Sequence, residues 1–296
     1  MDRRTLLISL ASPAVLPSHS AVAGSAAESR QISYPVFGGQ EDSFRHYCIE
    51  VLKLAVEHCG VSYQLKPVLQ PVGQGRAIRQ LSAGEGPLNI LWSMTSAERE
   101  RDLLPLRFPL DRGLMGWRLL LVRKAEQQRF AQIRSLEELR GLTAVQMHDW
   151  PDTQILRANG LQVGTGSSYE NLFAMLQHGR TDYFPRSVLE IAEDLERFGT
   201  RHDLAIAPGL LLRYPTAFYF FVSPREPALA KDLSLGLERI ISNGSWRALF
   251  LQHMRRQSKA LKLPERQVLA LRNPLLPAAT PLQRTELWEE PGRLGA

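Results

Sequence analysis

The stretch that most constrains the fold of this 296-residue chain runs over residues 88–124, where two apolar runs flank a short, strongly charged segment. The first run, 88–92, and the second, 115–122, each have the length of a strand buried on both faces. Residues 97–101 between them carry too many charges to be core. In an open α/β sheet, a side chain just past the carboxyl end of a parallel strand points into the crevice that binds ligands. Arg99 has this position, which by itself leaves two interpretations: a ligand contact, or a surface arginine beside Glu98 and Glu100.

The elements expected before this stretch predict a parallel sheet. Strands over 31–37, 61–69 and 88–92 alternate with two helices, one from Asp42 or Ser43 to Cys59 and one over 74–82. This order gives right-handed crossovers, as in one lobe of a solute-binding protein or in half of a Rossmann fold. The glycines after the first two strands do not form G-x-G-x-x-G, and no Walker lysine signature is present, so nucleotide binding is not expected.

Four short motifs resemble those of type 2 periplasmic solute-binding proteins, the bacterial family 3 binding proteins of amino acid importers. They are Thr95-Ser96-Ala97-Glu98-Arg99, Phe108-Pro109-Leu110, Leu121-Val122-Arg123-Lys124 and Gly179-Arg180-Thr181-Asp182. The resemblance covers roughly residues 31–254. It implies an α/β protein with the type II periplasmic binding fold, in which two lobes, each a mostly parallel sheet flanked by helices, close over a solute.

The resemblance also implies a division of the chain. We expect residues 31–122 and 216–272 to form the first lobe and residues 123–215 the second. Two crossings, near 122–128 and 214–218, would then make the hinge. Residues 273–296 are rich in proline and poor in apolar residues, and we expect a wrapping or frayed tail there.

In the family, an arginine clamps the carboxylate of the ligand through two parallel hydrogen bonds, and the resemblance implies this role for Arg99. Where relatives usually have glycine and serine or threonine, this chain has the bulky His148-Asp149-Trp150. Trp150 could provide a stacking wall for the ligand or only pack between loop and lobe. Amino acid binders hold the ammonium of the ligand with an acid a few residues after Asp182. Arg186 stands there instead, and it could contact an anion or pair with Glu190 one turn on. The expected ligand contacts are Arg99, Thr95, Tyr34, Phe37, Met94, Trp150, Asp149 and Arg186.

The leading functional hypothesis is a soluble, monomeric periplasmic receptor that captures a small anionic or amino-acid-like solute and delivers it to an ABC-type importer. One alternative is a protein of the same fold that reports its ligand to a membrane signalling partner, and another is a cleft dehydratase. We expect no enzyme activity, metal or cofactor, because the seven histidines show no metal-ligand spacing and no nucleophile motif is present. The basic residues behind the net charge of +6 are scattered, which argues against nucleic acid as a partner.

The N-terminus predicts export to the periplasm. Arg3 and Arg4 precede an apolar run, and small residues lead up to a cleavage site expected after Ala23, so residues 1–23 read as a signal peptide for Sec or twin-arginine export. Cys48 and Cys59 fall on one predicted helix, ~16 Å apart at the usual rise per residue. That separation is too long for a disulfide, so we expect buried free thiols.

Overall fold

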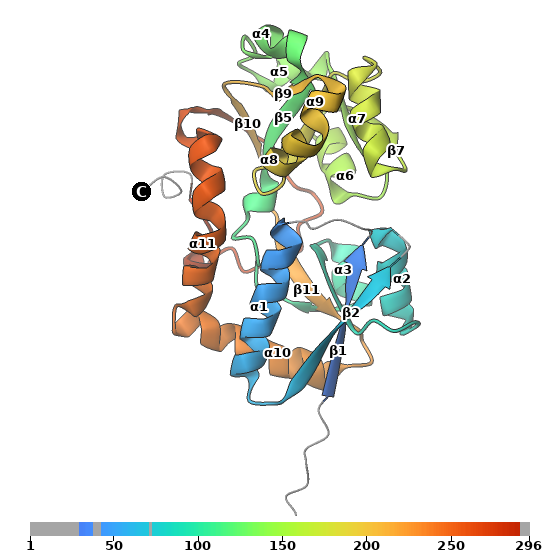
Figure 1. Ribbon diagram of the computed structural model, residues 1–296, viewed down its shortest axis with the longest axis vertical. Coiled ribbons are helices and arrows are strands. Elements are labelled where there is room, and N and C mark those ends of the chain that lie inside the picture. The colour runs from blue at the N-terminus through green and yellow to red at the C-terminus, as the bar shows by residue number, and fades with distance from the viewer. Residues whose placement is uncertain (1–29, 38–42, 71–72, 291–296) are drawn as a thin grey trace, which may run out of the picture.

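The chain folds into two lobes that lie one above the other in Figure 1. The structure, a computed structural model, describes residues 30–37, 43–70 and 73–290, without the side chains of Phe37, Gln70 and residues 254–260. The predicted signal peptide, 1–23, lies outside these residues. Two α/β lobes with helices packed on their sheets confirm the predicted fold class.

Lobe one begins with the predicted alternation of strands and helices. These elements are β1 (Arg30–Phe37), α1 (Ser43–Cys59), β2 (Tyr63–Gln70), α2 (Gln74–Ala83) and β3 (Ile90–Met94). β1 and β2 pair in parallel, and Asn89 links β1 to the start of β3 by donating from its backbone N to Ser33 O, 3.1 Å away. After α3 (Ala97–Asp102), β4 (Leu104–Leu106) and β3 flank β11 (Phe218–Val222) in antiparallel pairs.

The long helix α1 forms because its apolar residues recur every three to four positions and face the sheet of lobe one. Phe44, Tyr47, Val51 and Leu52 are buried on this face. Cys48 and Cys59 are also buried and both are free, as predicted. α10 (Pro227–Ser242) packs so closely on α1 that a Cβ at Gly236 would lie 2.1 Å from Ala55 O. α11 (Ser245–Ala260) then runs along the side of lobe one toward lobe two (Figure 1).

Lobe two is built on a second sheet with the strand order β12-β10-β5-β8-β6-β7, in which β9 also pairs with β5. Its strands are β5 (Trp117–Arg123), β6 (Thr143–Met147), β7 (Gln162–Gly166), β8 (Tyr183–Ser187), β9 (Leu204–Ile206), β10 (Leu210–Arg213) and β12 (Gln267–Ala270). Its helices are α4 (Gln127–Phe130), α5 (Leu136–Arg140), α6 (Pro151–Ala158), α7 (Tyr169–Gln177), α8 (Ile191–Asp194) and α9 (Thr200–His202).

The structure corrects the predicted division of the chain at two places. β5 lies inside the second sheet, between β8 and β10, so lobe one does not extend to residue 122. β12 lies at the edge of the same sheet, although we expected residues 216–272 to belong to lobe one. The two crossings therefore run over residues 107–116 and 214–217. An apolar, buried strand such as β5 fits either sheet, and strand pairing decides between them. β12 is mostly exposed and joins the second sheet only as an edge strand beside β10.

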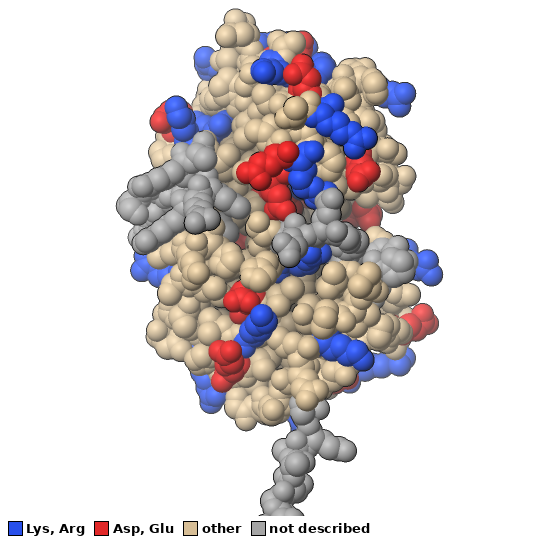
Figure 2. Space-filling view, viewed as in Figure 1, with Lys and Arg blue, Asp and Glu red and all other residues tan. Residues whose placement is uncertain are grey.

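Residues 191–202 of lobe two form α8, a π-helical turn (Leu195–Gly199) and α9 in direct succession. Within the described residues, no helix is both long and apolar enough to cross a membrane. On the face seen in Figure 2, acidic and basic side chains alternate without a large patch of one sign.

Candidate functional site

Arg99 lies at the carboxyl end of β3, as the sequence predicts. Ser96 caps α3 by accepting a hydrogen bond from the backbone N of Arg99 at 3.3 Å, which fixes where the helix begins. The Arg99 Nη1 then donates to Ser93 Oγ at 2.7 Å and to Met94 O at 2.6 Å. The guanidinium is therefore held back against the strand that precedes it.

Polar groups of α2 lie beside this arginine. The Ser93 hydroxyl, which accepts from Arg99, donates in turn to Gln74 Oε1 at 3.3 Å. Gln74 is the first residue of α2, so the start of that helix and the end of β3 meet at the same edge of lobe one. This edge faces lobe two.

Asp149, in the loop after β6, reaches lobe one. Its Oδ2 would lie 3.0 Å from a Cβ placed on Gly75 in the first turn of α2. Its Oδ1 is buried and accepts no hydrogen bond from the part of the chain that the structure describes. Burial lowers the pKa of Arg99, and the negative charges of Asp149 and Asp152 act in the opposite direction. The arginine of lobe one and the acids of lobe two thus face one another across the interlobe cleft.

A buried ion pair inside lobe two contacts the second crossing through Tyr214. Arg118 on β5 lies 2.6 Å from Asp152 Oδ1 and 3.8 Å from Glu190 Oε2. The Tyr214 hydroxyl accepts from Arg118 Nε at 2.9 Å and itself donates to Asp152. Burial acts to lower the pKa of Arg118, but Asp152, Tyr214 and Glu190 together outweigh it and the pKa is raised. Burial raises the pKa of Tyr214, so the phenol stays a neutral donor.

Arg186 is buried on β8 and compensated by two carboxylates. Its Nε lies 2.6 Å from Asp194 Oδ2 and its Nη2 lies 3.2 Å from Glu190 Oε2. The ion pair with Glu190, one of the two alternatives drawn from the sequence, is confirmed. The other alternative, an anion contact, is not supported, because a guanidinium already paired with two acids has little charge left to attract a third anion.

Trp150 packs beside Arg186. The guanidinium carbon of Arg186 lies 5.2 Å from the ring centroids of Trp150 and Phe184 and 5.3 Å from that of Tyr169. Trp150 therefore stacks within lobe two, as the packing alternative expected, and its role as a wall for the ligand stays a prediction. The sequence could not show this cage, because its three rings come from the start of α6, the first residue of α7 and strand β8.

The remaining residues that we expected to contact the ligand offer it few side-chain groups. Thr95 is completely buried and its hydroxyl donates to Glu100 Oε1 at 2.7 Å, so in this arrangement it does not offer that proton to a solute. The Met94 side chain is buried in the core, and only its carbonyl reaches the site, through Arg99. Tyr34 is buried against Trp92, with ring centroids 6.0 Å apart. Phe37 ends β1, and its side chain lies outside the described residues.

Sequence reasoning missed the residues that support the site, above all Arg118, Asp152 and Tyr214. One signal was available, since Arg118 is the single charge between Trp117 and Val122 in an otherwise apolar strand. A lone charge in a strand buried on both faces requires a buried partner. Among the described residues, no group of three or more His, Cys, Asp and Glu side chains could hold a metal ion.

The comparisons with known proteins place the fold. No family model matches the chain, and no curated protein matches it either. Among solved structures, an ancestral arginine-binding protein bound to arginine is similar, with 15% identity over 75% of this chain and 97% of that one and a TM-score of 0.55. The GluR0 ligand-binding core from Nostoc punctiforme in complex with L-glutamate is 17% identical over 75% of this chain and 98% of that one, with a TM-score of 0.51. The VFT2 domain of BvgS from Bordetella pertussis is 17% identical over 75% of this chain and 92% of that one, with a TM-score of 0.54. The fold of this chain is therefore the two-lobed, type II periplasmic binding fold.

Proposed function

We propose that this chain, folded as a type II periplasmic binding protein, is an exported, monomeric receptor that captures a small amino-acid-like solute between its lobes for an ABC-type importer. The observation that carries the proposal is the position of Arg99 at the carboxyl end of β3, facing acids of lobe two. Ligands of open α/β sheets bind at such strand ends. The arrangement supports binding rather than catalysis, because the buried acids and arginines around it pair with one another.

The charges of the cleft favour a solute that carries both signs. Arg99, Arg118 and Arg186 face four carboxylates, those of Asp149, Asp152, Glu190 and Asp194. A purely anionic solute would add charge of the sign already in excess. An amino-acid-like solute instead matches Arg99 with its carboxylate. Its ammonium matches the Oδ1 of Asp149, which has no hydrogen-bond partner among the described residues. This choice narrows the solute class that the sequence left open.

A thermal-shift screen of amino acids, simple carboxylic acids and amines on the mature protein tests the proposal. A solute at a hundred times its dissociation constant is expected to stabilise the protein by about 2.7 kcal/mol. We expect Arg99→Ala to abolish the shift, because the carboxylate loses its cation. The matched control is Arg101→Ala, which removes an exposed arginine of the same helix that pairs with Asp102 at 2.8 Å and should keep the shift. An unchanged shift in Arg99→Ala would remove this residue from the site.

A second candidate function keeps the cleft and changes the partner. The similar structures include a ligand-binding core and a VFT2 domain, which by their names are parts of larger proteins. A receptor of this fold could therefore report its solute to a membrane signalling protein instead of a permease. Crosslinking the solute-loaded protein in membranes of the source cells, followed by identification of the captured membrane protein, separates the two. Sequencing the N-terminus of the exported protein tests cleavage after Ala23.

A further inference from the structure

The chain crosses between the lobes again after α11. It enters lobe two as β12, which pairs in parallel with β10 from Leu210↔Gln267 to Arg213↔Ala270. The Asn159 side chain at the end of α6 then binds both backbone groups of Arg272, accepting from its N at 2.9 Å and donating to its O at 2.7 Å. The segment is thus fixed to lobe two at two neighbouring points.

The same segment returns to lobe one within the next twenty residues. Arg284 places its guanidinium on the carboxylate of Glu238 in α10, with N–O distances of 2.6 and 3.0 Å. Leu287 is completely buried. Glu289 forms an ion pair with Arg112 at 2.8 Å in which each side chain is only 8% exposed. We call residues 267–289 the C-terminal strap.

The strap contacts both crossings of the hinge. Arg112 belongs to the first crossing, and besides Glu289 it binds the carbonyl oxygens of Glu286 and Trp288 at 2.8 and 2.9 Å. A Cβ at the next residue, Gly113, would lie 2.8 Å from the Trp288 ring. At the second crossing, Asn273 Nδ2 donates to Pro215 O at 2.9 Å. Both crossings, 107–116 and 214–217, are therefore bonded to the strap.

We propose that the C-terminal strap restrains the hinge and holds the lobes close together. Hinged proteins open through changes at a few backbone residues of the crossings. Here such a rotation moves Asn273 away from Pro215 or Arg112 away from Glu289. Because Arg112 and Glu289 are buried, separating them leaves two charges without water or a counterion. The strap thus resists separation of the two lobes. Contacts of the strap, which lie outside the cleft, limit how far the lobes separate.

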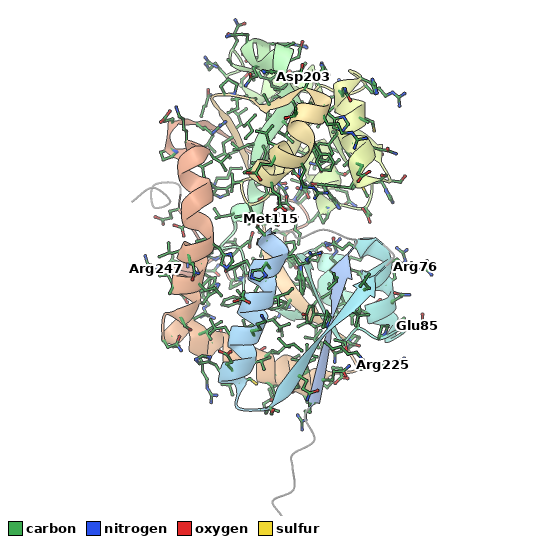
Figure 3. The ribbon with its side chains drawn as sticks, in the orientation of Figure 1. Arg76, Glu85, Met115, Asp203, Arg225 and Arg247 are labelled. Atoms are coloured by element: carbon green, nitrogen blue, oxygen red, sulfur yellow. The ribbon has the colours of Figure 1, made fainter. Side chains whose placement is uncertain are left out.

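Cutting the strap after the protein has folded tests this proposal without a solute. A specific protease sequence is inserted between Ala278 and Ala279, which are both exposed. Spin labels are attached at Glu85→Cys, at the outer edge of lobe one (Figure 3), and at Glu170→Cys on α7 of lobe two. Cys48 and Cys59 are buried and should not take label. Arg284→Ala and Glu289→Gln are added so that the severed end can leave lobe one.

We expect the distance between the two labels to lengthen and its distribution to broaden after cleavage. The uncut chain with Arg284→Ala and Glu289→Gln should lie between the uncut wild type and the cut protein. The control carries the protease sequence between Gly60 and Val61, in the turn from α1 to β2, where cleavage should leave the distribution unchanged. A distribution that is the same before and after the strap is cut would overturn the proposal, whatever the solute of the cleft proves to be.

Discussion

At the residue scale, burial decides what a charged side chain can do. Asp111 is completely buried in the first crossing, where its carboxylate accepts from Met115 N at 2.7 Å and from Phe218 N at 3.3 Å. Burial is the main cause that raises its pKa from 3.8 to about 6, although these backbone donors oppose the shift. Asp111 therefore takes up a proton on folding at mildly acidic pH.

The raised pKa of Asp111 predicts a pH-dependent contribution to stability. Because the folded pKa lies above the unfolded value, the contribution is fully present below pH 3.8 and is lost as the pH rises through about 6. The free energy of unfolding of the wild type, relative to that of Asp111→Asn, should fall by about 2.4 kcal/mol between pH 4 and pH 7. Urea denaturation of both proteins at a series of pH values measures this. A difference that does not change with pH would contradict it.

At the element scale, the cap of a short helix positions the central arginine. α3 has only six residues, too few for a helix that is stable by itself. Ser96 fixes its first turn, and Arg99 lies in that turn. α5 offers a matched element away from the cleft, because Ser135 accepts from Glu138 N at the same distance of 3.3 Å.

We predict that Ser96→Ala and Ser135→Ala both lower the free energy of unfolding by about 1 kcal/mol, the usual cost of losing a serine cap. Only Ser96→Ala should also weaken solute binding, because the first turn that carries Arg99 loosens. Chemical denaturation gives the first quantity, and titration with a solute found in the thermal-shift screen gives the second. Equal affinities in the two variants would show that the α3 cap does not position Arg99.

At the scale of the whole molecule, the site depends on how closely the lobes approach. Gly75 of lobe one and Asp149 of lobe two leave room for a hydrogen at the glycine Cα and for little more. A side chain larger than methyl at this position must displace the Asp149 carboxylate from its place beside α2. Any wider separation of the lobes is opposed by the strap, which is bonded to both of them.

Gly75→Val is therefore expected to lower solute affinity by about tenfold or more, since forcing methyl groups into a packed contact costs about 1–3 kcal/mol. Arg76→Val is the control, because it places the same side chain one residue on, where the position is exposed. Both variants should give similar free energies of unfolding in urea. If Gly75→Val bound the solute as tightly as Arg76→Val, the close approach of Asp149 to α2 would play no part in binding.

The sequence by itself determined the elements of lobe one and the position of Arg99. β1, α1, β2, α2 and β3 follow from local periodicity and from glycine stops, which act over neighbouring residues. The resemblance in four short motifs also indicated the two-lobed fold, which the structure and its similar structures confirm.

Only the tertiary structure decided which sheet β5 and β12 join, how Arg186 is compensated, and that Asp149 approaches Gly75. An apolar strand such as β5 is equally stable in either of two buried sheets until its edges find partners, and β12, which is mostly exposed, is placed only by its pairing with β10. Likewise, the charge that compensates a buried arginine comes from wherever the folded chain brings a carboxylate within a few ångström, and no local pattern records that distance.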